Sequence, residues 1–460
     1  MKKTQKISFF GLFALGFGAI IGVGWSATLN NLFNIAGGPV PATFSFLLAT
    51  VAFLTVALCF AELSMAITGP GGVVMYAQRA FDKKTGFIGG WFICMAYIAI
   101  LPFEAIAIND ILIYVFPTLK MWEPMYHIAG ENIYPLSVFV GVIMSIVVFL
   151  INYRGIEGGV RFQKIMTIIL LGGSLICVFF ALLKADVKNL FNPVYSPVEG
   201  KSHITMVAGV FSLLSVAAQF FSGFDTILQS ADLAESKSLG KAILTSVIGA
   251  GLFYALIFLA AGAAFPWLKT TQMPRPVLSN LFTTIYPGPL GKVLWYICMI
   301  ATLAGLYSTW NGFFLSGSRA LLGMANSNLI PSFFAKQHSR FGTPVIALVV
   351  CFIASVAGPF LGAGMLDVIG LLSSAGLIIG WGIACFATVK LRIAEPNMER
   401  PYRIPGGITI PIIACLICLF VFANSIIPSM PGYMGAGGIV ALVIWSCLGF
   451  VFYNVRALKK

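Results

Sequence analysis

The stretch GFGAIIGVGW, residues 16–25, lies inside the first apolar segment of this 460-residue chain. Four of its ten residues are glycine, and each glycine in a helix interior costs about 1 kcal/mol relative to alanine. Two explanations are open. Glycines let a helix break where it lines a cavity, and they let neighbouring helices pack closely. Both explanations require that the segment lies in a membrane.

The composition of the chain predicts an all-α polytopic membrane protein. Hydrophobic residues make up 59% of the sequence and charged residues only 9%, with a mean hydropathy of +0.96. A soluble domain carries roughly 25% charged residues. Apolar runs of about 20 residues, enough to span a bilayer as a helix, recur along the whole chain. A large soluble helical protein is therefore a poor explanation.

Twelve apolar segments predict twelve transmembrane helices in a single transmembrane domain, residues 1–460. The first run, from Phe9 to beyond Phe33, follows three lysines but is too long for the apolar core of a signal peptide, so we expect a retained helix. The predicted spans are centred near Gly18, Val51, Met95, Met144, Leu171, Leu214, Phe253, Ala304, Val350, Gly376, Leu416 and Val443.

The distribution of basic residues predicts the orientation. With the N-terminus in the cytoplasm, the cytoplasmic side holds 21 of the 28 Lys and Arg residues and the outer side holds 7. This is the bias of the positive-inside rule. We therefore expect an integral plasma (inner) membrane protein with both termini cytoplasmic. The bilayer explains the net charge of +13 without a nucleic-acid partner, and the oligomeric state stays open.

A second interrupted segment favours the helix break. The sixth predicted span contains AAQFFSGFDTILQSADLAES, residues 217–236, with several polar residues and a glycine at membrane depth. Spans one and six hold corresponding positions in two five-helix halves, and interrupted helices at such positions indicate a transporter's substrate site. Free amides at the first break suit a carboxylate, and free carbonyls at the second suit an ammonium group. An amino-acid backbone offers both groups.

Five motifs resemble those of the amino acid/polyamine/organocation permeases and follow in that family's order. They are GAIIGVG (18–24), ELSMAITGPGGVVMYAQRAF (62–81), FSGFDT (221–226), STWNGFFLSGSRALLGMANSNLIP (308–331) and RPYRIPGG (400–407). The resemblance implies a LeuT-type 5+5 inverted repeat with broken helices 1 and 6, plus two C-terminal helices, working by alternating access. The first repeat would cover about 9–184, the second about 205–392, and helices 11 and 12 about 408–456.

The resemblance also implies the substrate-binding residues. The carboxylate would meet backbone amides around Gly24, and the amine would meet carbonyls around Phe221. Val23, Trp25 and Gln219 depart from the hydroxyl, aliphatic and gating aromatic residues that many relatives have there. The predicted set is Gly22, Val23, Gly24, Trp25, Glu104, Gln219, Phe220, Phe221, Ser222 and Phe224.

Four acidic residues lie inside predicted spans, where an ionisable group is a candidate for function. Glu62 and Asp110 lie near helix ends, so they either act in the site or simply reach an interface or pair with a neighbour. Asp225 follows the second break and either caps the next segment or contacts substrate. Glu104 follows Pro102 and has three readings: a contact for a cationic group, a proton carrier, or a structural hydrogen bond.

Coupling to Na⁺ or H⁺ is open at this stage. In sodium-coupled members of the fold, adjacent hydroxyls like those of Ser308 and Thr309 complete a Na⁺ site, and a hard cation prefers oxygen ligands. The alternative is that Ser308 is only a motif residue. Proton-coupled relatives often carry a lysine in helix five; the alignment puts Leu170 there, with Lys164 about two turns away. Asp225 is the remaining coupling candidate, and no bound cofactor is expected.

The predicted function is a secondary active transporter, a symporter or exchanger, for a neutral or cationic amino acid or a related small amine. The sequence places no basic residue near the site, so an anionic side chain would be buried unpaired. One alternative is a carrier of the same fold for a nucleobase, ethanolamine or an inorganic cation. A membrane-embedded enzyme is a weaker alternative, because no catalytic set is evident and His127, His203 and His338 fall in predicted loops.

Overall fold

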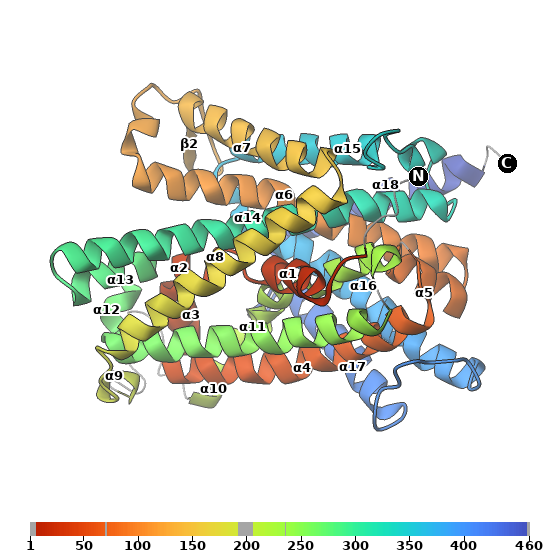
Figure 1. Cartoon of the computed structure of the whole chain (residues 1–460), viewed down its shortest axis with the longest axis horizontal. Coiled ribbons are helices and arrows are strands. Elements are labelled where there is room, and N and C mark those ends of the chain that lie inside the picture. The colour runs from red at the N-terminus through yellow and green to blue at the C-terminus, as the bar shows by residue number, and fades with distance from the viewer. Residues whose placement is uncertain (1–5, 70, 192–205, 235, 458–460) are drawn as a thin grey trace.

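The computed structural model describes residues 6–69, 71–191, 206–234 and 236–457, which form a bundle of helices (Figure 1). Several positions named above lie outside these residues: Lys2 and Lys3 of the three N-terminal lysines, His203, and residue 205, the predicted start of the second repeat. The elements of the first part are α1 Phe9–Ile20, α2 Gly24–Ala27, α3 Leu29–Ala36, α4 Pro39–Ala66, α5 Val73–Ala80, α6 Lys83–Val115, η1 Pro117–Lys120, β1 Tyr126–Ile128, β2 Glu131–Ile133, α7 Pro135–Tyr153, α8 Ile156–Leu182 and α9 Lys188–Phe191.

The second part begins at residue 206 and is also helical. Its elements are α10 Met206–Val216, η2 Ala217–Phe221, η3 Phe224–Leu233, α11 Ser236–Ala264, α12 Trp267–Thr271, α13 Val277–Ile285, α14 Pro289–Asn326, η4 Ser332–Ala335, α15 Val345–Ala357, η5 Gly358–Phe360, η6 Ala363–Met365, α16 Leu366–Ala394, α17 Thr409–Ile426 and α18 Gly435–Ala457.

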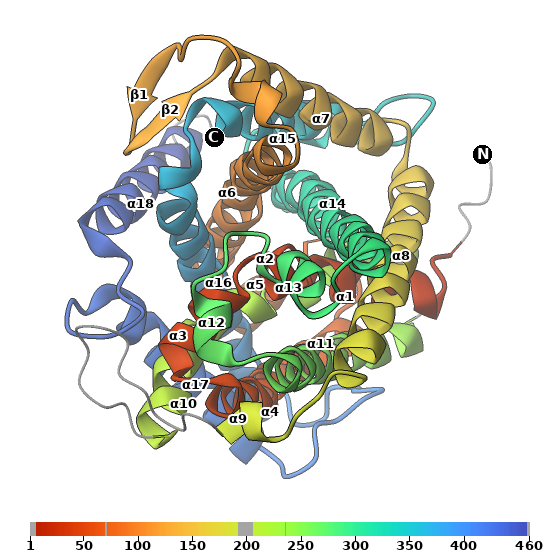
Figure 2. The same cartoon turned by 90° about the vertical axis from the view of Figure 1, so that its left-hand side faces the viewer.

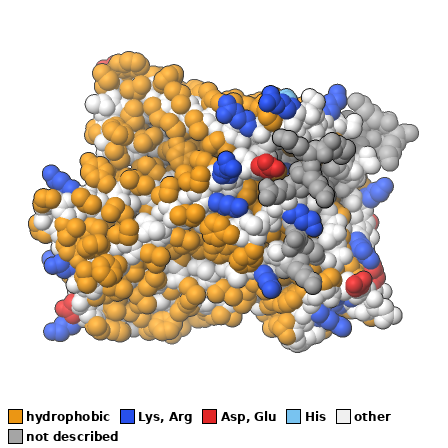
Figure 3. All heavy atoms as spheres, viewed as in Figure 1, with side chains coloured by type: hydrophobic (Ala, Val, Ile, Leu, Met, Phe, Trp, Pro, Cys, Tyr) orange, Lys and Arg blue, Asp and Glu red, His pale blue; other side chains and the backbone are white. Residues whose placement is uncertain are grey.

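The lengths and apolar surfaces of these helices make the chain an integral membrane protein. Among the described residues, ten helical segments are long and apolar enough to cross a bilayer. Two shorter apolar helices, Phe9–Ile20 and Val345–Phe360, contain the predicted centres of the first and ninth spans. Figure 3 shows one side of the molecule covered largely by apolar side chains, with Lys and Arg more frequent towards the right-hand end.

Helix α1 lies at the centre of the bundle (Figure 2). It packs against α8, α11 and α14, while α4 packs along α11, and α16 packs between α6 and α17. The end of the bundle that carries η1, the β1–β2 hairpin, α12 and α13 faces the viewer in Figure 2. We call it the mouth end. The opposite end, which carries α5, is called the closed end.

The first predicted helix break is present. Helix α1 ends at Ile20 and α2 begins at Gly24, and Ile21 between them has non-helical dihedrals (φ −91°, ψ 88°). The neighbouring helix α14 can approach this break because it has a glycine there. A Cβ added to Gly305 would lie only 2.6 Å from the carbonyl oxygen of Gly22.

The second explanation for the glycines, close packing, also applies, but to a different glycine. Gly18 lies inside α1, and a Cβ added to it would lie 2.1 Å from Ser308 Oγ on α14 and 2.7 Å from Thr167 Oγ1 on α8. Glycine at this position therefore lets α1 sit directly on polar groups of two neighbouring helices. The glycine-rich stretch thus combines packing before the break with freedom at the break.

The second predicted break is present as well. Helix α10 passes into the short 3-10 helix η2, after which Ser222 is extended (ψ 135°) and Gly223 has φ +122°, a conformation that favours glycine. A Cβ on Gly223 would lie 2.7 Å from the backbone carbon of Ala19. The two interrupted segments therefore touch each other at the centre of the bundle.

Candidate substrate site

A cavity of about 930 Å³ opens at the mouth end and reaches both helix breaks. Its walls come from α1, α2, α6, η2, α14 and α16, with loops of the mouth end around its opening. Eight of the predicted binding and coupling residues line it: Gly22, Val23, Gly24, Glu104, Gln219, Phe220, Ser222 and Thr309. Positions separated by up to 287 residues therefore meet in one chamber.

The backbone at the two breaks offers unused hydrogen-bonding groups to this cavity. Within the described part of the chain, the amides of Gly22 and Val23 donate no hydrogen bond, and the carbonyl of Ser222 accepts none. Gly24 follows as the first residue of α2, whose first-turn amides have no partner within that helix. One side of the cavity floor thus presents N–H donors, and the other presents a C=O acceptor.

Glu104 on α6 lies in the cavity wall beside the first break. Its side chain is almost fully buried, and Oε2 has no hydrogen-bond partner among the described residues. A Cβ added to Gly22 would lie 3.8 Å from Glu104 Oε1 and 3.1 Å from Thr309 Oγ1. Because an unpaired carboxylate at such depth is costly, this group is suited to meeting a cation or holding a proton.

Three predicted residues do not line the cavity with their side chains. Trp25 is fully buried, with its ring 5.6 Å from that of Phe253. The Phe221 ring stacks on Phe53, and the Phe224 ring lies 4.7 Å from Trp381. The breaks turn the chain, so these rings point into the core. Trp25 and Phe221 can reach a substrate only through their backbone. Of the predicted substrate-binding set, Trp25, Phe221 and Phe224 therefore do not form the cavity wall with their side chains.

The aromatic wall is formed instead by Phe220 and residues that the sequence did not single out. Phe220 Cε1 would lie 2.8 Å from a Cβ on Gly24, so its ring covers the start of α2. It also packs edge-on against Tyr254 of α11, with centroids 5.9 Å apart. Phe103, Tyr114 and Phe313 line the same chamber. Nothing local in their sequence distinguishes them from ordinary core aromatics.

Two of the three predicted coupling residues lie behind the cavity wall. Asp225 is buried and its Oδ2 accepts a hydrogen bond of 2.6 Å from the hydroxyl of Tyr97 on α6. Ser308 Oγ accepts a hydrogen bond of 2.8 Å from Gln163 Nε2. Thr309 does line the cavity, and its hydroxyl donates to the carbonyl of Gly18 over 3.3 Å.

Charged residues surround the outer part of the cavity. The acids are Asp110, Glu131 and Asp367, and the bases are Lys120 and Arg275. The prediction that no basic residue is near the site is therefore wrong for the cavity mouth, although none lines the floor beside the breaks. Lys120 and Arg275 belong to connections that fold back over the bundle, which helical periodicity does not reveal.

The closed end is sealed by contacts of charged and backbone groups. Arg319 on α14 donates to the carbonyl of Gln229 and to the carboxylate of Asp232, both on η3. The amide of Ile7, just before α1, donates to the carbonyl of Leu233 over 2.9 Å. These contacts hold α14 and the segment before α1 onto η3 at the end of the bundle opposite the cavity mouth.

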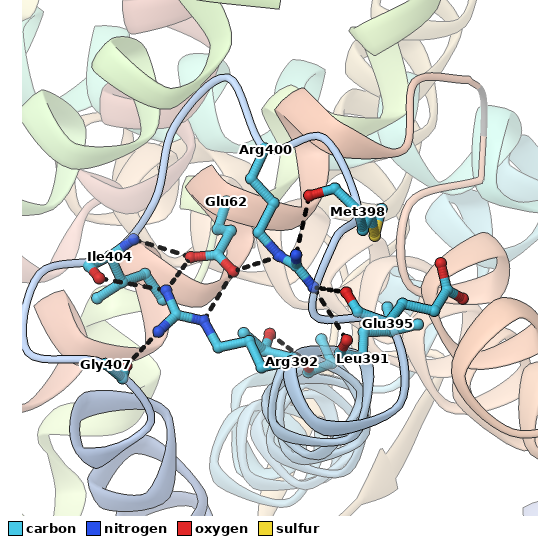
Figure 4. Close-up of polar contacts among 10 residues, drawn as sticks. Glu62, Leu391, Arg392, Glu395, Met398, Arg400, Ile404 and Gly407 are labelled. Carbon is cyan, nitrogen blue, oxygen red and sulfur yellow. Dashed lines mark hydrogen bonds and ion pairs between the residues drawn. The ribbon is translucent and has the colours of Figure 1, made fainter.

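Glu62 also lies at the closed end, in a buried ion cluster (Figure 4). Its carboxylate accepts hydrogen bonds from Arg392 of α16 (Nε to Oε1, 2.9 Å) and from the amide of Ile404 (2.8 Å). Arg400 Nε lies 3.2 Å from the same Oε1. The second reading of Glu62, that it pairs with a neighbour, is therefore confirmed. Asp110, the other acid near a helix end, faces the cavity mouth.

A helical bundle with a one-sided cavity that ends at two facing helix breaks defines a membrane transport protein. The family model described as amino acid permease matches residues 7–453, so the chain belongs to that family. It is a secondary transporter, as its family is.

The names of similar proteins state different substrates. The chain is 24% identical to the branched-chain amino acid permease BcaP of Bacillus subtilis over 99% of this chain and 93% of the relative. It is 23% identical to the methylthioribose transporter of the same organism (99% and 94%). It is 24% identical to that organism's glutamate/serine transporter AimA (99% and 83%). Family membership therefore defines the class of transporter. The substrate has to be inferred from the residues of the site.

Proposed function

We propose that this chain moves a neutral or cationic amino acid, or a related small amine, by alternating access. The proposed frame is twelve membrane crossings in a LeuT-type inverted repeat, with α1–α3 as broken helix 1 and α10–η3 as broken helix 6. One observation carries the proposal: the two breaks touch at Gly223 and Ala19 and border the same cavity. An amino-acid backbone fits between unused donors and acceptors.

In this proposal the substrate carboxylate binds the amides of Val23 and Gly24, and Gly22 leaves room beside them. The ammonium group binds carbonyls at the second break, including that of Ser222. Phe220 and Gln219 then lie around the substrate side chain, because both line the cavity next to these groups. No cofactor is part of this mechanism.

The charges along the cavity support selection against acidic side chains at its floor. Glu104 is an unpaired acid beside the first break, whereas Lys120 and Arg275 lie at the mouth together with three acids. A cationic group can supply the counter-charge that Glu104 lacks. An anionic side chain at the floor would find no basic partner there and would be buried unpaired.

A second candidate is a substrate without an amino-acid backbone, which the similarity to a methylthioribose transporter favours. Such a substrate would not need both the amides and the carbonyls of the breaks. If the wild-type protein takes up no amino acid or amine, that result would point to this candidate.

We further propose that the mouth end faces outside, so that both termini are cytoplasmic in the plasma membrane. The excess of Lys and Arg on the other side supports this orientation. A membrane-impermeant maleimide should label Glu123→Cys, exposed at the mouth end, but not Glu399→Cys, exposed at the closed end, in intact cells.

The test is uptake of radiolabelled neutral, cationic and acidic amino acids into proteoliposomes, competed by amines and nucleobases. Gly24→Leu should abolish uptake, because an added Cβ already approaches Phe220 to 2.8 Å and a larger side chain fills the space beside the amides. Gly172→Leu is the matched control, since nothing lies within 4 Å of its added Cβ. Normal affinity in Gly24→Leu would show that this backbone does not face the substrate.

A further inference from the structure

Gln163 on α8 occupies the place between α1 and α14 where the sequence suggested a sodium ion. Its side chain is fully buried. Nε2 donates one hydrogen bond to the carbonyl of Ala14 on α1 (3.1 Å) and another to Ser308 Oγ on α14 (2.8 Å). Both N–H bonds of the amide are therefore used, and they use a carbonyl and a hydroxyl oxygen of the kind that a hard cation would need.

The other half of the amide is held just as firmly. Oε1 of Gln163 accepts a hydrogen bond of 2.7 Å from Asn311 Nδ2, and Asn311 Oδ1 accepts one of 3.0 Å from Asn152 Nδ2. Asn311 also donates to the carbonyl of Gly159. This chain of amides fixes which end of Gln163 faces α1, because a flipped amide would set its oxygen against the carbonyl of Ala14 and its N–H groups against the Asn311 donor.

The space around this amide is closed to an additional ion. A Cβ added to Gly18 would lie 2.6 Å from Gln163 Nε2 and 2.1 Å from Ser308 Oγ, so α1 packs directly onto the pair. The neighbouring hydroxyl of Thr309 is also committed, since it donates to the carbonyl of Gly18.

We propose that the Gln163 amide takes the place of a coupling cation between α1 and α14, so that transport requires no sodium at this position. The inference rests on the proposed function, because it concerns how the carrier of that function is coupled. The amide supplies two polarised hydrogens to the oxygens that a cation would bind, and it does so without a charge that an ion gradient could drive. Gln163 acts here as a positioning residue for α1.

No ionisable side chain in the described structure replaces the ion at this point. Lys164, the next residue, packs its stem against Gly11 nearer the closed end. On α14, Tyr307 donates to the sulfur of Met144, and Arg319 binds η3. The remaining neighbours are occupied or exposed: Asp225 binds Tyr97, and Glu157, Arg161 and Lys241 are exposed. Protonation at this position therefore does not switch the contact in the wild type.

The first test needs no substrate. The melting temperature of the full-length protein in detergent is compared in NaCl and in choline chloride at equal ionic strength. We expect the same value in both salts. A melting temperature that rises with Na⁺ in the wild type would overturn the proposal. Because no uptake is measured, this result is readable even if the proposed function fails.

The second test converts the amide into an acid of the same shape. Gln163→Glu places a carboxylate against the carbonyl of Ala14 and Ser308 Oγ, where it is tolerated only when protonated, because α1 leaves no room for an ion there. At alkaline pH, uptake should fall by roughly tenfold or more. Acid should restore it, whereas Na⁺ should not. Gln337→Glu is the control, because it makes the same change at an exposed amide. It should gain no such dependence on pH.

If uptake by Gln163→Glu depends on pH no more than uptake by the wild type, the amide does not hold the two oxygens as a cation would and the proposal is wrong. If the variant does not fold, the comparison of salts on the wild type decides alone. Wild-type uptake in NaCl and choline chloride gives the matching functional readout, and a several-fold stimulation by Na⁺ would also contradict the proposal.

Discussion

Two buried glutamates of this molecule show how little burial alone says about a membrane acid. Glu62 and Glu104 are 1% and 2% exposed, and each lies in a long membrane helix. Glu62 is surrounded by two guanidinium groups and a backbone amide (Figure 4). Glu104 has a carboxyl oxygen with no partner among the described residues, and it faces the cavity.

Glu62 and Glu104 differ in the source of the counter-charge for the carboxylate. The protein itself supplies it for Glu62, so that group belongs to the fold. For Glu104 the protein leaves the position open beside Gly22 and Thr309, so a ligand or a proton must supply it. An intramembrane acid becomes a functional candidate when its partner is missing, which the sequence alone does not show.

The largest effect is expected when the Glu62 cluster loses its acid. Glu62→Ala leaves Arg392 and Arg400 buried without a counter-charge, which should lower the free energy of unfolding by about 3–5 kcal/mol. The measurement is unfolding of the detergent-solubilised protein by heat or denaturant. The control is Glu399→Ala, which removes an exposed acid from the connection between α16 and α17. It should change the free energy of unfolding little. An unchanged stability for Glu62→Ala would mean that the cluster does not support the fold.

An intermediate effect, on binding rather than stability, is expected at Glu104. Glu104→Gln keeps the shape and removes no internal partner, so the melting temperature should stay close to that of the wild type. A charge-assisted contact contributes roughly 1.5–3 kcal/mol, so affinity for a cationic substrate should fall about tenfold to a hundredfold. Affinity for a neutral substrate should hardly change. Equal losses for both classes, measured by competition of uptake, would assign Glu104 to proton movement or to the fold.

The smallest effect is expected at an exposed ion pair of the closed end. Arg79 Nη2 lies 2.7 Å from Glu395 Oε2, and both side chains are more than a third exposed. Such pairs contribute about 0–1 kcal/mol, so Arg79→Ala should barely move the melting temperature at neutral pH. The hydrogen bond from Arg79 lowers the pKa of Glu395. The small contribution is therefore present above the ordinary carboxyl range and is lost as pH falls through the lowered pKa. A loss as large as that of Glu62→Ala would contradict the distinction between buried and exposed pairs.

The breaks and the spans could be predicted because their cause is local. Glycines at 22 and 24, and the Ser222–Gly223 pair amid polar residues, mark places where backbone can leave a helix in a membrane. Apolar runs mark the helices. That the two breaks face each other was expected from the inverted repeat that the family resemblance implies. The close approach of Gly223 to Ala19 agrees with this expectation.

Side-chain directions at the breaks could not be predicted. Within a regular helix, spacing decides which residues share a face, but Gly223 has φ +122° and Ile21 is non-helical, so the count is lost there. Phe220 therefore faces the cavity while Phe221 faces the core. Lys120 and Arg275 were missed because they arrive from loops. On α8, Leu170 was expected at the position where proton-coupled relatives often carry a lysine. The residue that contacts Ser308 is instead Gln163, two turns earlier.

The partners of Glu62 have a consequence for the order in which the protein can be completed. Arg392 and Ile404 follow Glu62 by 330 and 342 residues, so they leave the ribosome long after the helix that carries the carboxylate has entered the membrane. During that interval the acid must be protonated or reach water at the membrane surface. The closed end can therefore be sealed only when synthesis has passed α16 and the connection that precedes α17. A chain cut after residue 394 would retain Arg392 but lack Arg400 and Ile404, leaving the carboxylate with one of its three partners.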